Sequence, residues 1–79
     1  MTLDGLHSGI SAAIISVAWD DLAPDEAKRL RALGVDAGAE IQVTHRGVFG
    51  TRDPVAIRIG GMTVALRRAH ALAIEVQPQ

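Results

Sequence analysis

Residues 27–43, AKRLRALGVDAGAEIQV, decide the fold, and the first half of this stretch is the end of a helix. Leu30 and Leu33 share one helical face, whereas the basic residues around them point elsewhere. Gly34 stands where a helix needs a left-handed C-terminal residue, a conformation that glycine adopts at little cost. Val35 follows, placed to pack back on the last turn. The sequence therefore predicts a helix that stops at Gly34.

The second half of the stretch is a tight turn followed by a strand. Residues 36–38, Asp-Ala-Gly, are typical of a turn. From Ala39 the pattern alternates, with Ile41 and Val43 on one face and polar residues on the other. We therefore expect one short helix fastened to one strand by a rigid corner. None of the residues in that corner is a catalytic group.

The rest of the chain is predicted to be mainly β. The expected strands cover residues 10–18, 39–46, 54–59, 62–66 and 73–77. Pro24 suits the first turn of the helix between the first two strands, and residues 67–71 read as one helical turn before the last strand. Five strands this short cannot carry a helical layer on each face, but they can curl into a small barrel filled by Val, Ile and Leu.

Alternation predicts which strand residues face the core. We expect Ala13, Ile15 and Val17 on one face of the first strand, with Ile14 opposite them. Residues 60–61, Gly-Gly, predict a two-residue hairpin turn between the third and fourth strands. The inward residues expected on those two strands are Val55, Ile57, Ile59, Met62, Val64 and Leu66. Residues 47–53 are expected to form a loop.

Composition narrows the class of protein. The chain has 79 residues, which we interpret as a single domain over residues 1–79. Trp19 and Phe49 are the only aromatic residues, too few for a stacking platform for single-stranded nucleic acid or a proline-rich peptide groove. The net charge of -1 gives no electrostatic reason to bind nucleic acid or membrane, and the absence of cysteine excludes thiolate metal sites. Without a signal sequence or an apolar run of about 20 residues, we expect a cytoplasmic protein without direct membrane insertion.

The sequence offers little for catalysis or for a metal. His7, His45 and His70 are far apart, and a metal site would need the fold to gather them with a carboxylate such as Asp53 or Glu75. No hydroxyl lies in a nucleophile-elbow motif, and no glycine-rich segment resembles a phosphate loop. We therefore expect no enzyme activity, no cofactor, and neither catalytic nor metal-ligating residues.

The sequence fits a protein that binds another molecule better than it fits an enzyme. Val48 and Phe49 lie in the glycine-bounded loop and could form an exposed apolar contact, or Phe49 could fold back over an open end of the barrel. Arg67 and Arg68 follow a strand, and could pair with Asp20 or Asp21 or contact an acidic partner. Intramolecular pairing is the simpler of these two interpretations.

An ordered set of residues along nearly the whole chain resembles the FeoA domain family. The set consists of Leu6 and Gly9, Arg29-Leu30, Leu33-Gly34-Val35, Gly38, Ile41, Val43, Asp53-Pro54-Val55, Gly61, Ala65-Leu66-Arg67-Arg68 and Ala73-Ile74-Glu75-Val76. The resemblance implies a five-stranded SH3-like barrel. It also implies a small cytoplasmic protein that regulates FeoB, a membrane ferrous-iron transporter with a GTP-binding domain, by contact and without catalysis. The loop over residues 47–53 is longer than the family's short turn.

Three hypotheses follow for the function. The first is an accessory protein of ferrous-iron uptake that contacts the transporter's cytoplasmic part. Its expected contact residues are Lys28, Arg31, Val48, Phe49, Arg67 and Arg68. The second is a direct binder or sensor of a transition-metal ion that uses His45, His70 and nearby carboxylates. The third is a generic SH3-like module that binds another protein or forms a weak homo-oligomer.

Overall fold

A computed structural model describes residues 1–46 and 54–79 of the chain. The strands are β1 (Ser11–Val17), β2 (Glu40–Arg46), β3 (Val55–Ile59), β4 (Met62–Leu66) and β5 (Ile74–Pro78). The helices are α1 (Pro24–Ala32) and α2 (Arg68–Ala71), with short 3-10 helices η1 (Leu3–Gly5) and η2 (Trp19–Asp21). The mainly β class, the helix between the first two strands and the helical turn before the last strand are therefore confirmed.

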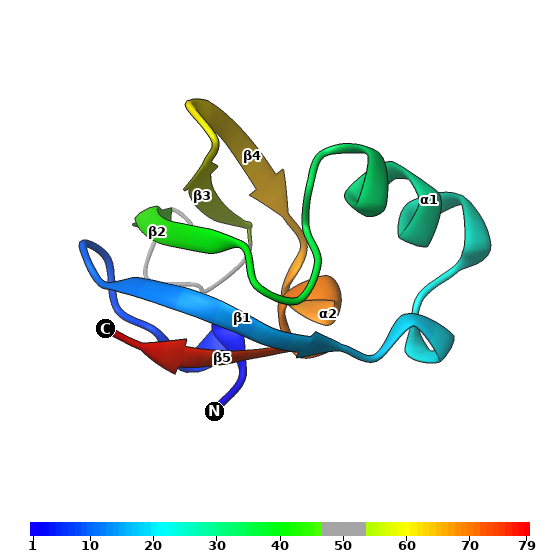
Figure 1. The fold of residues 1–79 in the computed structure, drawn as a ribbon, viewed down its shortest axis with the longest axis horizontal. Helices are drawn as coiled ribbons and strands as arrows, with labels where there is room; N and C mark the ends of the chain where they lie inside the picture. Colours follow the sequence, from blue (N-terminus) through cyan, green and yellow to red (C-terminus); the bar gives the residue numbers. More distant parts are fainter. Residues whose placement is uncertain (47–53) are drawn as a thin grey trace.

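The five strands form one antiparallel sheet in the order β4-β3-β2-β1-β5, which curls around one apolar core (Figure 1). The described residues at the centre of the core come from every strand and from α1, among them Leu30, Val43, Ile57, Leu66 and Val76, all fully buried. The alternation predicted for Ile41 and Val43 of β2, and for the residues of β3, is therefore correct. The register between β2 and β3 shifts after Val43.

The predicted corner after α1 is present. The Val35 N–H donates to the Leu30 carbonyl at 3.0 Å, and the Gly34 N–H donates to the Arg31 carbonyl at 3.0 Å. These two bonds, with Gly34 at φ 92°, form a Schellman motif that ends the helix. Gly38 at φ 90° closes the following turn, and its N–H donates to the Ile14 carbonyl at 2.8 Å. The corner therefore ties α1 to both β1 and β2.

The β3–β4 hairpin follows the prediction, apart from one residue. Its strands pair without a register shift, and Gly60 and Gly61 have φ values of 55° and 85°, as a type I′ turn requires. Val64 and Leu66 are buried, but Met62, expected to face inward, is 43% exposed. Met62 directly follows the turn, whereas its cross-strand partner Ile59 is buried.

The prediction for the first strand was wrong about its faces. Ala12 and Ile14 are buried, whereas Ile15 is 49% exposed. The register with β5 shifts between Ile14 and Ser16, so Ile15 is the extra residue of a β-bulge. The bulge reverses the alternation, because Val17 beyond it packs against the core. Simple alternation therefore fails at this point.

The N-terminal segment covers the free edge of β5. Thr2 bridges to Glu75, and the Val76 N–H donates to the Met1 carbonyl at 2.7 Å. Leu3 and Leu6 of this segment are buried in the core.

Candidate functional site

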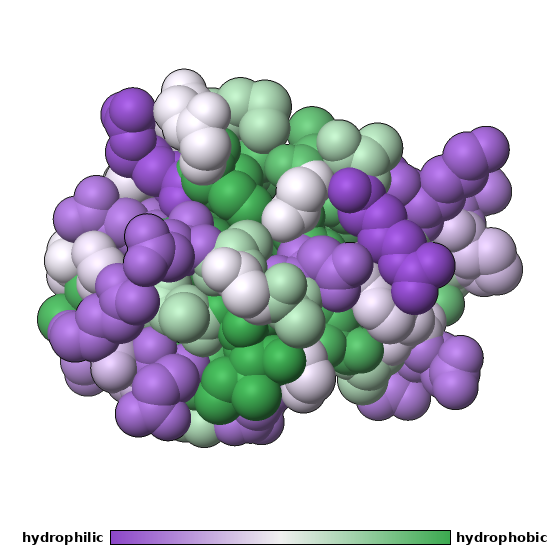
Figure 2. Space-filling model, viewed as in Figure 1, coloured by the Kyte–Doolittle hydropathy of each residue, from purple (hydrophilic) through white to green (hydrophobic). Residues whose placement is uncertain are grey.

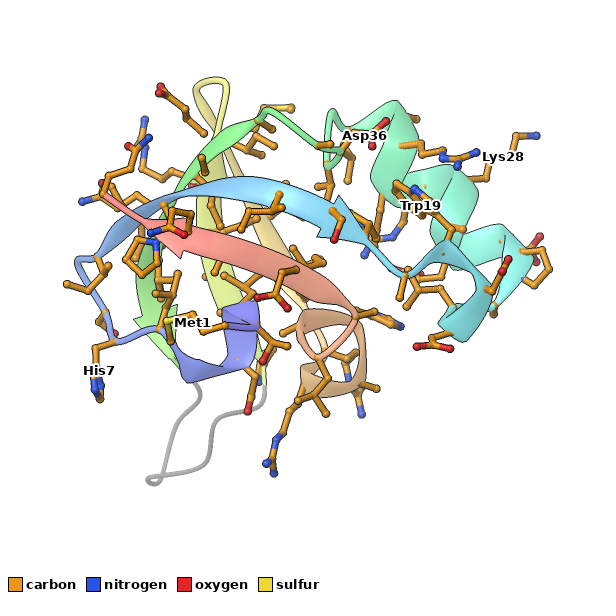
Figure 3. The ribbon with its side chains drawn as sticks, turned by 60° about the horizontal axis from the view of Figure 1, so that its bottom comes forward. Met1, His7, Trp19, Lys28 and Asp36 are labelled. Carbon is orange, nitrogen blue, oxygen red and sulfur yellow. The ribbon has the colours of Figure 1, made fainter. Side chains whose placement is uncertain are left out.

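The exposed side of α1 carries two of the predicted contact residues, Lys28 and Arg31. The Arg31 guanidinium lies 4.3 Å from the centre of the Trp19 ring, a cation–π contact that holds both side chains in place. Trp19 itself packs against the edge of the core. Figure 3 shows Trp19 against α1 and Lys28 extending from the helix into solvent. We call Trp19, Lys28 and Arg31 the α1 surface.

Apolar residues on its inner side hold α1 to the barrel. Leu30 is fully buried, and Ala27 and Leu33 are partly buried against the core. Pro24 occupies the first turn, where its missing N–H costs nothing, but the N-cap residue Ala23 makes no side-chain hydrogen bond. The helix is therefore secured at its C-terminal end by the corner and is held less firmly at its N-terminal end.

An ion pair runs along the side of α1. Arg29 donates from Nε and Nη2 to Glu26 Oε1 at 3.0 and 2.6 Å. The hydrogen bond from Arg29 lowers the pKa of Glu26, with smaller contributions from the charges of Arg29 and His70, although partial burial opposes the shift. The same pairing raises the pKa of Arg29. His70 of α2 approaches the same carboxylate oxygen, with Nδ1 3.5 Å from Oε1.

Intramolecular pairing was the simpler interpretation for Arg67 and Arg68, and Arg68 does form an intramolecular ion pair, but with Asp4 in place of the suggested Asp20 or Asp21. The Arg68 Nε lies 3.3 Å from Asp4 Oδ1, because α2 contacts the N-terminal turn η1. Arg67 is exposed and is the N-cap residue of α2. Arg67 and Arg68 thus lie at α2, on a different element from Lys28 and Arg31.

Other predicted residues lie beyond what the structure describes. Val48, Phe49 and Asp53 fall outside the described residues, and so does the side chain of His45. Among the side chains that the structure describes, no three from His, Asp or Glu form a group that could hold a metal ion.

An open groove of about 580 Å³ lies between the corner after α1 and the β3–β4 turn. Its lining residues are Leu33, Gly34, Gly38, Ala39, Glu40, Ile59 and Gly60. Glu40 is the one charged residue among these lining residues. On the face shown in Figure 2, apolar residues lie in the middle, and hydrophilic residues lie at both the α1 end and the opposite end.

Sequence reasoning placed Lys28 and Arg31 on an exposed helix, which the structure confirms. It missed the stacking of Arg31 on Trp19 and the approach of His70 to Glu26. No local pattern signals either contact, because each joins residues from different elements.

None of the described helices is both long enough and apolar enough to cross a membrane.

Comparison with solved structures shows the same fold in several proteins. The FeoA protein of Chlorobium tepidum is 33% identical, with a TM-score of 0.85 over 99% of this chain and 70% of that chain. FeoA of Stenotrophomonas maltophilia, described as a prokaryotic SH3 domain protein and solved in complex with zinc, is 34% identical. Its TM-score is 0.78, over 98% of this chain and 89% of that one.

A third structure, IdeR of T. acidophilum, has a TM-score of 0.82 at 20% identity. The match covers all of this chain and 34% of the IdeR chain. At this low identity it supports the fold alone. Comparison with curated protein sequences gave no match. The family model described as the FeoA domain matches residues 1–78. The SH3-like five-stranded architecture is therefore confirmed, and this chain belongs to the FeoA domain family, which is associated with ferrous iron transport.

Proposed function

We propose that this protein is a cytoplasmic accessory of ferrous-iron uptake that contacts the cytoplasmic part of an FeoB-type transporter and performs no catalysis. Membership of the FeoA domain family is the observation that carries the proposal. The described residues support it, since they offer an ordered surface and no group of metal-ligating side chains.

The α1 surface is the part of the molecule that we propose as the contact. Trp and Arg are the residue types that contribute most to binding energy at protein interfaces, and here Trp19 and Arg31 are already stacked. Because their contact restricts both side chains before binding, less conformational entropy is lost on association. Lys28, which is exposed, adds a second positive charge for an acidic partner surface.

The test is calorimetric titration of the transporter's purified cytoplasmic part, including its GTP-binding domain, with this protein and its variants. We expect Arg31→Glu to weaken binding about ten-fold or more, because it reverses a charge and removes the stacking on Trp19. Lys28→Glu is expected to have a smaller effect.

The matched control is Arg58→Glu, the same charge reversal at an exposed position of β3. It should leave the affinity unchanged. Equal losses in Arg31→Glu and Arg58→Glu would show a general charge effect and would contradict the α1 surface as the contact. No measurable heat with the unmodified protein would contradict the proposed function itself.

Direct metal binding is the second candidate, and the zinc complex of the Stenotrophomonas maltophilia relative is the observation that favours it. Among the described side chains no group of ligands supports a site. Anaerobic calorimetry with Zn²⁺ and with Fe²⁺ tests this candidate, and the absence of heat at near-stoichiometric protein would remove it.

A further inference from the structure

We propose that His70 is a pH-dependent clasp that, when protonated, fixes the N-terminal end of α1 to α2. The consequence for partner binding rests on the proposed function, since α1 carries the α1 surface. The clasp itself rests only on contacts within this chain.

The geometry brings one imidazole nitrogen to one carboxylate across two elements. His70 Nδ1 lies 3.5 Å from Glu26 Oε1, and each side chain is 22% exposed. Nδ1 is buried and, among the described residues, makes no hydrogen bond. In the neutral tautomer with the proton on Nε2, Nδ1 presents a lone pair to the carboxylate. Protonation places an N–H and a positive charge there, which converts the contact into a charge-assisted pair.

The carboxylate is ionised over the pH range in which histidines change charge. The Arg29 hydrogen bond lowers the pKa of Glu26 from 4.5, so Glu26 is negative at pH 5 and above. Imidazole side chains ordinarily change charge between about pH 5 and pH 8. Wherever His70 carries a second proton within this range, it faces an ionised Glu26. The attraction is therefore greatest in mildly acidic solution.

The other charged groups around this pair set its strength. On α1, Arg29 donates to the same Oε1 atom and opposes a second positive charge there. On α2, Arg68 lies 3.3 Å from Asp4 of η1, so that pair ties α2 to the N-terminal turn. α2 is thus fixed on one side by Arg68, while His70 extends to α1 on the other. Protonation of His70 then holds α1 to an element that is already anchored.

The N-terminal end of α1 is the part that such a contact would stabilise. Glu26 lies in the first turn, and the N-cap residue Ala23 supplies no side-chain hydrogen bond. Leu30, the fully buried residue of α1, lies a turn further on, near the Gly34 corner. Because apolar burial is concentrated at that end, one added ion pair changes the opening of the first turns more than it changes global unfolding.

The test is amide hydrogen exchange of α1 in the isolated protein at pH 5.5 and 7.5, corrected for intrinsic exchange rates. We expect protection of the first turns of α1 to be about two- to five-fold higher at pH 5.5, the range that partly exposed ion pairs produce. His70→Gln and Glu26→Gln should each abolish this difference. His7→Gln, which removes an exposed histidine outside the contact, should preserve it.

Equal protection at both pH values in the unmodified protein, or an unchanged pH response in His70→Gln, would overturn the clasp. Partner binding is measured separately by the calorimetric titration at the same two pH values. An intact pH response without any binding would refute the proposed function and leave the clasp. Binding without a pH response in α1 would refute the clasp and leave the proposed function.

Discussion

The β3–β4 hairpin pairs its strands without interruption, whereas the β1–β5 pair shifts register between Ile14 and Ser16. The hairpin is closed by a two-residue glycine turn and held by alternating apolar side chains. Distant segments reinforce the β1–β5 side: the N-terminal residues pair with β5, and Arg68 of α2 pairs with Asp4. The comparison shows that one side of the sheet is specified locally and the other by contacts between segments far apart in the sequence.

The two regions should differ most in the loss of stability that follows when one isoleucine from each is truncated to alanine. Ile57 of β3 is fully buried, and Ile57→Ala should lower the free energy of unfolding by about 2–5 kcal/mol, since it removes apolar contacts and leaves a cavity. Urea denaturation followed by circular dichroism measures the change.

Ile15→Ala is the matched control on β1. Ile15 is 49% exposed at the bulge, so its truncation should change the free energy of unfolding by about 0.5 kcal/mol or less. A loss in Ile15→Ala as large as that in Ile57→Ala would show that the bulge residue belongs to the core, and the distinction between the two strands would fail.

Local features of the chain could be predicted from the sequence. The Gly34 corner, the Gly60-Gly61 turn and the alternation of β2 and β3 depend on residues within a few positions of one another. The residues that determine each of these features are therefore close together in the sequence, and the sequence is enough to predict the feature. The exposure of Lys28 and Arg31 follows in the same way from the helical face that Leu30 defines.

Features that join distant segments could not be predicted. The bulge at Ile15 exists because of the register that β1 adopts with β5, at the other end of the chain. The contacts of Arg68 with Asp4 and of His70 with Glu26 depend on where α2 packs in the folded chain. Charge alone suggested Asp20 or Asp21 as partners for Arg68, but the fold brings α2 next to η1, so Arg68 pairs with Asp4.

The hairpin turn offers a second, smaller way to examine the locally specified side. Gly61 has φ 85°, and a Cβ there would meet no atom within 4 Å. Gly61→Ala should therefore destabilise the protein through backbone strain alone, by about 1–2 kcal/mol. Gly61→Asn should cost less, because asparagine tolerates this conformation and is common in type I′ turns. Equal losses in both variants, measured by urea denaturation, would show that strain at φ is not the cause.

The smallest expected effect concerns the Glu26–Arg29 ion pair within α1, which lies outside the hairpin. The Arg29 hydrogen bond lowers the pKa of Glu26 below 4.5, so the unfolded chain binds a proton to this group more readily than the folded chain does. The stabilisation is therefore present above about pH 4.5 and is lost as the pH falls through the lower pKa of the folded state. Because Arg29 is 46% exposed, solvent screens the pair, and we expect it to contribute about 0.5 kcal/mol or less.

A double-mutant cycle isolates this contribution from the helix propensities of the new residues. Glu26→Gln, Arg29→Gln and the double variant are compared with the unmodified protein by urea denaturation at pH 6 and pH 3. The coupling energy should be measurable at pH 6 and smaller at pH 3, because acid protonates Glu26 and removes its charge. A coupling that is unchanged between pH 6 and pH 3 would mean that the pair does not act through the Glu26 charge. The first turns of α1 would then be held by packing, as the β3–β4 hairpin is, and this contrast between the helix and the hairpin would be lost.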